Sequence, residues 1–483
     1  MKLHVIIVSL FLSVVSITHA RTPSKPNWTD AEQYVLNQVK NGDPADFADR
    51  AQKELSGAFV RELLINADDH IAISQHGITI LHAVVTSDVD LINEEIPNDI
   101  SLNGVFEGEF NASQSHFLRT LDLSGSTFQR QVDFENAVIR FDYIIDNCKF
   151  EFYSPDDSSA YFKSIRVERD WSMQAAPPTL IPVQFRGPVD FTQSDVGGKL
   201  LASSVTFQSG AEFDSMRVTG EVILREAVFG DGEAKFCDTH FSNLFLNEAH
   251  FENTSLLDLT RMQVESVFLD KVQYPNNGSV KIEGMTFKSM SPASWDGLQD
   301  LRNHSEYDPE FYTNLETLFR SHGHTTQADR VFIEKQRHDR IGICQSILHD
   351  CQRGRWAFSL LEDWLTGYGR SLENLLLWSV GFVLFGTWAF RRSAMKRVDS
   401  RGAEILGRPA KLRYWRVRRW LMGIYGGFWY SLDLFLPIIE LGEREKWEPQ
   451  DNRRWAVFYK KVHAIIGHLF VPIGLAAWTG IIK

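Results

Sequence analysis

The sequence contains few cysteines, four among 483 residues. Cys148 and Cys237 fall in a repetitive region and are expected to be small buried residues. Cys344 and Cys351 lie close together in a segment that we place outside the membrane, where a disulfide bond can form. No pair of Cys or His residues has zinc-ligand spacing around these cysteines, so a zinc site is not supported.

Motifs of common catalytic sites are also absent from the sequence. It contains no G-x-S-x-G nucleophile elbow, no glycine-rich phosphate-binding loop and no H-E-x-x-H pair. The acidic residues of the repetitive region fall at positions expected to face solvent, so we predict a solvated surface and not a paired acid and base. The sequence therefore predicts no catalytic residue, no cofactor, no metal ligand and no enzymatic activity.

An excess of positive charge is found in one short stretch. Residues 391–419 hold eleven Lys or Arg against two acids, Asp399 and Glu404. The formal net charge is −12 and this stretch contributes +9, so the rest of the chain carries −21. Nucleic-acid binding requires clustered basic charge, so we expect no nucleic-acid partner for the acidic part.

The first twenty residues, MKLHVIIVSLFLSVVSITHA, have the pattern of a secretory signal peptide. Lys2 precedes an apolar run, and Thr18 and Ala20 occupy the −3 and −1 positions of a cleavage site before Arg21. The alternative is an uncleaved anchor helix. Both interpretations export the residues that follow.

Two apolar stretches near the other end, about 372–390 and 462–482, predict membrane spans. The first is slightly short for a bilayer of about 30 Å. The basic stretch 391–419 follows it, and the positive-inside rule places that stretch in the cytoplasm. Residues 21–370 are therefore predicted to be extracytoplasmic and anchored in the cell (inner) membrane, with lipid as a partner.

Residues 420–441 are apolar and aromatic but contain Asp433. An acid inside the membrane is costly and is usually functional. An interfacial or re-entrant segment avoids that cost, and it places Arg416, Arg418 and Arg419 near lipid phosphates. We favour this arrangement, with two spans, over a third span that would bring the C-terminus inside.

A large apolar residue returns at every fifth position of FCDTHFSNLFLNEAHFENTSL (236–256). These residues are Phe236, Phe241, Leu246, Phe251 and Leu256, and the positions two before them are small or apolar: Ala234, Thr239, Leu244, Ala249 and Thr254. A helix repeats near 3.6 residues and a strand near 2, so neither explains the spacing. A chain that bends after each five-residue side, and pairs each coil with the next about 4.8 Å away, does explain it. The pattern predicts a solenoid.

Elsewhere the apolar positions step by five or six, which requires an extra residue at some corners. The predicted inward residues include Leu123, Phe128, Phe134, Ile139, Ile144, Phe150, Phe191, Val196, Leu201, Phe207, Phe213, Val218, Ile223 and Phe229. The alternative is a β-sandwich with irregular strands. The scarcity of hairpin dipeptides at regular spacing counts against it.

These units resemble the pentapeptide-repeat family, in which a small residue, a polar residue, Leu or Phe and two polar residues recur. AHFEN (249–253) and AVIRF (137–141) fit with different fidelity. The resemblance implies a mainly β fold, a right-handed quadrilateral β-helix of roughly eight coils over 71–290. Residues 151–186 lose the repeat and are predicted to form an insertion. GYG before the first span and YSLDLFLP resemble a subgroup of bacterial membrane proteins with degenerate repeats.

Helices are predicted to cover both ends of the solenoid, because an open end exposes core and unpaired backbone. Residues 307–341 predict two helices joined near 321–323, with Asp308 as N-cap and Pro309 in the first turn. His322 and His324 are expected to be polar residues of that turn. The predicted boundaries are a signal peptide at 1–20, a helical cap at 21–70, the repeats at 71–290, a helical segment at 291–370 and a membrane region at 371–483.

These residues are compatible with three functions. The first is a structural or protein-interaction module of the cell envelope, with an unidentified protein partner. The second is an ion-channel-like or transport-related protein, because LTGYGRS (365–371) is similar to a potassium-channel filter. Such a channel needs an outer membrane helix before the filter, which is missing, so a turn at the membrane interface is favoured. The third, implied by the family, is an acidic rod that imitates DNA, but an exported rod would not meet a cytoplasmic topoisomerase.

Overall fold

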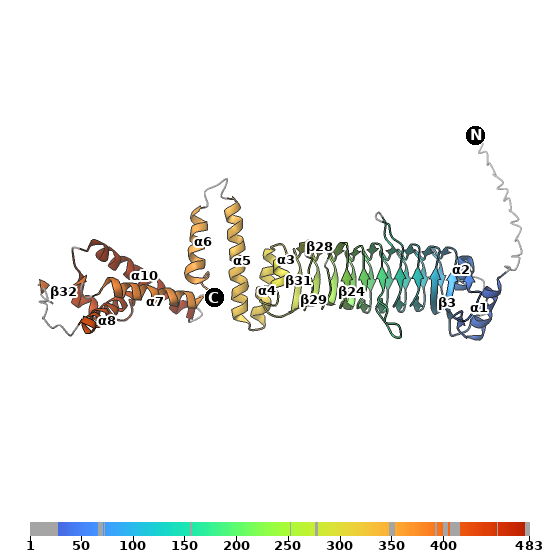
Figure 1. Cartoon of the computed structure of the whole chain (residues 1–483), viewed down its shortest axis with the longest axis horizontal. Coiled ribbons are helices and arrows are strands. Elements are labelled where there is room, and N and C mark those ends of the chain that lie inside the picture. Colours follow the sequence, from blue (N-terminus) through green and yellow to red (C-terminus); the bar gives the residue numbers. More distant parts are fainter. Residues whose placement is uncertain are drawn as a thin grey trace, which may run out of the picture. The chain divides into compact units, whose positions relative to one another are not determined.

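A computed structural model of the chain shows a coiled β region followed by helices (Figure 1). Contacts divide the chain into a first unit, Met1–Pro292 with Asn303–Glu306, and a second unit, Ala293–Arg302 with Tyr307–Lys483. The predicted signal peptide lies outside the described residues. The structure describes residues 28–65, 71, 73–154, 157–251, 253–275, 279–346, 353–391, 394–398, 404–405, 416–451 and 453–478.

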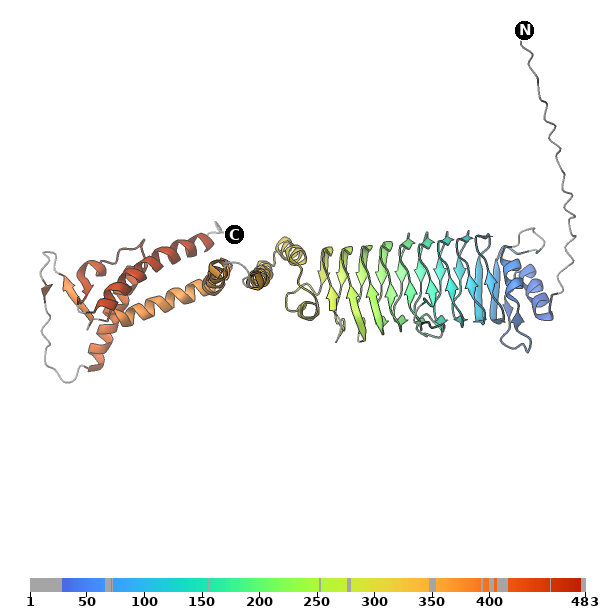
Figure 2. The ribbon, with the colours of Figure 1, turned by 90° about the horizontal axis from the view of Figure 1, so that it is seen from above.

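The first unit contains a parallel β-solenoid whose strands form four stacks (Figure 1, Figure 2). Each strand pairs in register with the strand one coil before it and one coil after it. Val132, for example, pairs with Phe110 on one side and with Ala160 on the other. One stack has nine strands, so the solenoid makes about nine turns where the sequence predicted roughly eight.

The strands of each stack are as follows. The nine-stranded stack contains β4 (Val89–Asp90), β7 (Phe110–Asn111), β11 (Val132–Asp133), β15 (Ala160–Tyr161), β19 (Val189–Asp190), β23 (Ala211–Glu212), β26 (Gly232–Lys235), β28 (Thr254–Asp258) and β30 (Ser279–Lys281). The next contains β5 (Glu95–Ile96), β8 (His116–Phe117), β12 (Val138–Ile139), β16 (Arg166–Val167), β20 (Asp195–Val196) and the first parts of β24 (Arg217–Ile223), β27 (His240–Phe245), β29 (Gln263–Phe268) and β31 (Thr286–Ser291).

The last two stacks share their first long strands, β3 (Ile78–Val85) and β6 (Ile100–Phe106). One adds β1 (Ala45–Asp46), β9 (Leu121–Asp122), β13 (Tyr143–Ile144), β17 (Trp171–Ser172), β21 (Leu200–Leu201) and the second parts of β24, β27, β29 and β31. The other adds β2 (Glu54–Leu55), β10 (Thr127–Phe128), β14 (Lys149–Phe150), β18 (Gln184–Phe185), β22 (Thr206–Phe207) and β25 (Val228–Phe229).

Every side of a coil points two residues inward, two positions apart. Phe110 with Ala112 and Leu121 with Leu123 are examples, and all four are buried. Large inward residues form ladders along the axis. One ladder runs through Phe106, Phe128, Phe150, Phe185, Phe207, Phe229 and Phe251, and the other through Phe110, Phe134, Phe162, Phe191, Phe213 and Phe236, with each ring stacked on the next.

Four predicted inward residues are wrong by one position. Ile144, Leu201, Ile223 and Leu256 are half-buried on the outer side, and the inward residues are Ile145, Ala202, Leu224 and Leu257. The reason is the corner: the steps from Ile139 to Ile145, from Val196 to Ala202 and from Val218 to Leu224 are six residues, and the step from Phe251 to Leu259, the second inward residue after that corner, is eight. A strand alternates its faces, so an error of one residue reverses the side chain.

The predicted insertion at 151–186 is too broad. Two loops, one with residues 151–154 and 157–159 and the other at 174–182, leave the solenoid at different corners, and β15, β16 and β17 between them stay in their stacks. Trp171 pairs with Tyr143 and with Leu200 and is fully buried. Both loops sit at corners because an extra segment there leaves the strand pairing intact.

The N-terminal end of the solenoid is covered by α1 (Asp30–Asn41) and α2 (Gly57–Ile65). Thr29 forms a capping box with Glu32 that starts α1, and Gly42 ends it in the left-handed region. Phe59 and Leu63 of α2 are fully buried. The helical cap predicted for this end is present.

Of the two repeat-region cysteines, Cys148 is fully buried, as predicted, and Cys237 is half-buried. The predicted Cys344–Cys351 bond cannot be placed, because Cys351 lies outside the described residues.

The second unit contains helices and one small antiparallel sheet. α4 (Pro309–Ser321) starts at the N-cap Asp308, whose carboxylate accepts a hydrogen bond from the Phe311 N–H at 2.9 Å. His322 ends α4 and, like His324, is exposed, which confirms the predicted turn. The other elements are α3 (Gln299–His304), α5 (Thr325–Ser346), α6 (Arg353–Thr366), α7 (Leu372–Ala389), β32 (Met395–Val398), β33 (Glu404–Ile405), α8 (Arg416–Phe435), α9 (Glu443–Lys446), β34 (Trp447–Pro449) and α10 (Arg454–Trp478).

Helices α7, α8 and α10 pack together. The segments that connect them contain β32, β33 and β34, which form the small antiparallel sheet. β32, which follows α7, pairs with β33 before α8 and with β34 before α10. The chain therefore enters α8 from this sheet and returns to it afterwards. Leu375 near the start of α7 and Phe470 late in α10 belong to one cluster, so these two helices run antiparallel (Figure 2).

Candidate functional site

Charged residues on the outside of the solenoid pair across successive coils. Lys271 Nζ lies 2.6 Å from Glu248 Oε1, and Arg261 donates hydrogen bonds to both carboxylate oxygens of Asp238 at 2.6 Å. Exposed pairs of this kind contribute little stability. Their effect is on the surface, because they partly neutralise the solvated acidic face that the sequence predicted.

A second set of acidic side chains closes the corners of the coils. Asp133 Oδ1 accepts a hydrogen bond from the Glu135 N–H at 2.7 Å, and burial raises the pKa of Asp133 although this bond opposes the rise. Such a turn supports the backbone locally. Sequence reasoning missed this role, whose signal is an Asp or Asn between the two inward residues of a side. The same contact recurs at Asp90, Asn111, Asp122, Asp190 and Asp258.

Among the residues that the structure describes, no three His, Cys, Asp or Glu side chains are grouped so as to hold a metal ion. The polar clusters of the second unit are instead built around single carboxylates and one histidine.

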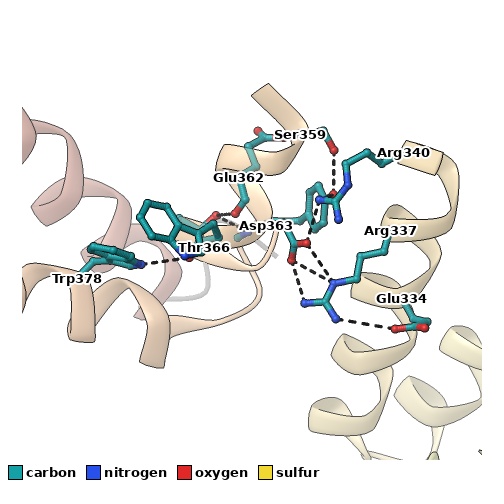
Figure 3. A network of polar contacts seen from close by, with 11 residues as sticks. Glu334, Arg337, Arg340, Ser359, Glu362, Asp363, Thr366 and Trp378 are labelled. Atoms are coloured by element: carbon teal, nitrogen blue, oxygen red, sulfur yellow. Dashed lines mark hydrogen bonds and ion pairs between the residues drawn. The ribbon is translucent and has the colours of Figure 1, made fainter. Parts of the chain in front are cut away.

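The first cluster joins α5 to α6 (Figure 3). Asp363 on α6 accepts hydrogen bonds from Arg337, at 3.1 Å from its Nη2, and from Arg340, at 2.9 Å from its Nη1. The Asp363 side chain is 14% exposed. Burial raises the pKa of Asp363, but the two guanidinium groups outweigh it and hold this pKa below its usual range. The carboxylate thus braces the hairpin of the two helices.

The GYG sequence is the turn that follows α6. Gly367, Tyr368 and Gly369 all have positive φ, which is rare for a tyrosine. The Tyr368 hydroxyl lies 2.8 Å from Ser359 Oγ and accepts from Arg340 at 3.1 Å, so it extends the Asp363 cluster. A filter requires rows of free carbonyl groups, whereas the Gly367 carbonyl here accepts from the Arg370 N–H. The geometry is that of a closed turn.

The second cluster lies where α7, α8 and α10 meet. His463 is fully buried, with Nε2 3.1 Å from Ser431 Oγ and Nδ1 3.1 Å from the Tyr459 hydroxyl. Small residues allow this close approach: a Cβ added to Gly386 would overlap Ser431, and one added to Gly467 would overlap the Phe435 carbonyl. Polar bonds between closely packed helices stabilise a helical bundle in lipid.

Asp433 is also fully buried, but it is not an isolated charge. Its Oδ1 accepts from the Leu441 N–H and its Oδ2 from the Arg444 N–H, both at 2.8 Å. The sequence predicts an interfacial or re-entrant segment because an isolated acid in the membrane is costly, and here two backbone N–H groups satisfy the carboxylate. The carboxylate closes the turn by which the chain leaves α8 and returns towards β34.

Large apolar side chains are exposed on α7 and α10. In α7, Leu377 is 73% exposed, and in α10, Phe458 is 70% exposed. Among the described residues one helix, Arg454–Ala476, is long and apolar enough to cross a membrane. It begins earlier than the predicted span 462–482, because α10 starts directly after β34. α7 occupies the predicted span 372–390. The other large exposed apolar residues of the two helices are Leu376, Val380, Leu384, Phe385, Trp388, Trp455, Ile465, Leu469, Ile473 and Leu475.

No protein-family model matches this chain, and no curated protein matches it. The solenoid fold and the geometry of the helical unit are therefore the basis for a function.

Proposed function

We propose that this chain is a membrane-anchored, extracytoplasmic solenoid of the pentapeptide-repeat type, and that it is a structural or protein-interaction module of the cell envelope, not an enzyme. The observation that carries the proposal is the distribution of exposed apolar side chains on α7 and α10, whereas the solenoid, which belongs to the other unit, has a polar exterior. Large exposed apolar surfaces of this extent mark contact with lipid or protein.

The direction of the chain supports two crossings. α7 and α10 run antiparallel, and β33 and β34 belong to one sheet. The chain therefore enters the bundle with α8 and returns to the same end of the bundle after α8. With the basic stretch 391–419 in the cytoplasm, that end is the cytoplasmic one. Residues 21–370 and the C-terminus then lie outside, as a signal peptide at 1–20 also predicts.

The solenoid is the part proposed to meet a protein partner. Repeat solenoids present extended, regular surfaces that suit binding of macromolecules. Many outer charges of its described residues form cross-coil pairs, such as Lys199 with Glu221 at 2.8 Å, so these basic side chains are matched by acids and do not form the clustered basic charge that nucleic acid requires. The loop 174–182 adds an apolar contact surface, because Leu180 is 61% exposed.

The proposal is tested in two steps on the full chain. First, membranes are washed with alkaline carbonate: an integral protein stays in the pellet, and release into the wash contradicts the anchor. Second, the solenoid is crosslinked in intact cells through photoreactive residues at Leu180 and, as a control, at buried Phe207. A defined protein adduct at Leu180 and none at Phe207 is expected, and repeated failure at Leu180 contradicts the interaction role.

A channel is the second candidate, favoured by the buried His463–Ser431–Tyr459 cluster, since polar groups within a membrane bundle often mark ion pathways. The GYG turn does not support it, because this turn is closed on Thr366 and Asp363. Reconstitution in a planar bilayer decides: no conductance across ions and voltages removes this candidate.

A further inference from the structure

Helix α6 has its two faces arranged in an unusual way. Its polar side, with Ser359 and Asp363, faces α5 and is bonded to Arg340, Arg337 and the Tyr368 turn (Figure 3). Its apolar side carries exposed residues: Phe358 is 61% exposed and Trp364 is 59% exposed. A water-soluble helix hairpin buries the apolar faces against each other. Here the polar faces are paired, so the apolar face is left for another environment.

The exposed face of α6 continues directly into α7. Trp378 of α7 donates a hydrogen bond from Nε1 to the Trp364 carbonyl at 3.2 Å, and the two indole rings lie 4.1 Å apart between centroids. One groove of about 800 Å³ is lined mostly by apolar residues, Ala357, Leu360, Leu361, Trp364, Leu377 and Trp378, together with Arg337, Asp363 and Asn374. The apolar surface is thus continuous from α6 to the lipid-facing side that we proposed for α7.

The directions of the two helices fit a membrane surface. Both views show the axis of α6 crossing that of α7 steeply (Figure 1, Figure 2). A helix that crosses a bilayer and a helix that lies along its surface meet at such an angle. Tryptophans favour the interface between water and hydrocarbon, where Trp364 and Trp378 would sit side by side.

We infer that α6 is an interfacial helix, whose apolar face of Phe358, Leu360, Leu361 and Trp364 inserts into the outer surface of the membrane beside α7. The occupant of this face is phospholipid. The Asp363 brace holds α5 on the polar side of α6 and so fixes the start of the extracytoplasmic part at the lipid surface. The inference rests on the proposed membrane anchor and adds a second, surface-bound contact to it.

The test uses the full chain in nanodiscs of phosphatidylcholine and phosphatidylglycerol. Photoreactive p-benzoylphenylalanine replaces Phe358, or Leu361 in a second variant, and both positions are exposed, so the core is left intact. Leu377 in α7 is the control for the anchor, and Val228, an exposed apolar residue of the solenoid, is the control for random contact with lipid. Lipid adducts are measured by mass spectrometry after irradiation.

Lipid adducts at Phe358, Leu361 and Leu377, with at least tenfold fewer at Val228, are expected. Adducts at Leu377 without adducts at Phe358 or Leu361 overturn the interfacial role and leave the anchor in place. The absence of adducts at all three overturns both proposals. Crosslinks from Phe358 to a second copy of the chain also overturn the inference, because they show that protein covers this face.

Discussion

Phe191 and Phe213 stack one coil apart, with their ring centroids separated by 4.7 Å and their planes 7° from parallel. Both rings are buried, and each also meets Phe207 edge to face. Stacked and edge-to-face contacts together fill the interior of the coil. This relationship recurs along the solenoid.

Replacing Phe213 by Ala is expected to destabilise the solenoid by about 3–5 kcal/mol. The substitution leaves a cavity between the rings of Phe191 and Phe236, and the strand pairing keeps these two rings apart. The matched control is Phe245→Ala. Phe245 stacks on Phe268 at 4.4 Å on the outer surface, so its loss is expected to cost about 1 kcal/mol. Urea unfolding followed by circular dichroism measures both. Equal effects would contradict an aromatic core.

A backbone prediction concerns Gln114, an exposed corner residue with a φ of 57°. A β-branched side chain is strained there, so Gln114→Val is expected to destabilise by about 1–3 kcal/mol. Asn tolerates this conformation, and Gln114→Asn should leave the melting temperature nearly unchanged. Equal melting temperatures of the valine and asparagine variants would contradict the left-handed backbone conformation of Gln114.

The positions of the coils were predictable to different degrees, and the errors have one cause. Phe236, Phe241 and Phe251 have no large apolar neighbour in the sequence, and all three point inward as predicted. The four wrong positions lie in runs of adjacent apolar residues, where hydrophobicity cannot choose between neighbours. These runs are Tyr143–Ile145, Leu200–Ala202, Val222–Leu224 and Leu256–Leu257.

The polar clusters of the second unit were not predictable in the same way. Asp363 and Arg337 belong to different helices, and only the fold of the hairpin brings them together. Asp433 was singled out from sequence, but its partners are backbone N–H groups of Leu441 and Arg444, which no residue pattern marks. The solenoid follows from a repeat that is visible in the local sequence, whereas these polar clusters form only through contacts between residues far apart in the sequence.

A pH-dependent contribution is expected from Asp146. Burial raises its pKa above the ordinary value of 3.8, although hydrogen bonds from Ser172 Oγ and the Gln174 N–H oppose the rise. The folded state therefore binds the proton more readily than the unfolded state, and stability rises as pH falls through the window between the two pKa values.

Asp146→Asn keeps the Oδ1 acceptor and removes the buried charge. The variant is expected to be at least as stable as the native chain at pH 7, and to gain less than the native chain when the pH is lowered to about 4, close to the ordinary pKa of an aspartate. The measurement is the difference between their melting temperatures at the two pH values, which cancels other titrating groups. A constant difference would contradict the role given to Asp146.

Loss of the brace between α5 and α6 is tested with Asp363→Asn. Hydrogen bonds to charged groups contribute about 1.5–3 kcal/mol, so amide exchange along α6 is expected to accelerate by about tenfold or more. Glu334→Gln is the control, because Glu334 lies 4.0 Å from Arg337 and makes a weaker contact. Unchanged exchange in the Asp363 variant would show that other contacts hold the hairpin.

The central claim is that a solenoid outside the cell membrane is held by an antiparallel pair of crossing helices. The most direct measurement is a map with alkaline phosphatase fused after residues 300, 400 and 483. We expect activity at 300 and 483 and none at 400. An inactive fusion at 300 would place the solenoid in the cytoplasm and contradict the account.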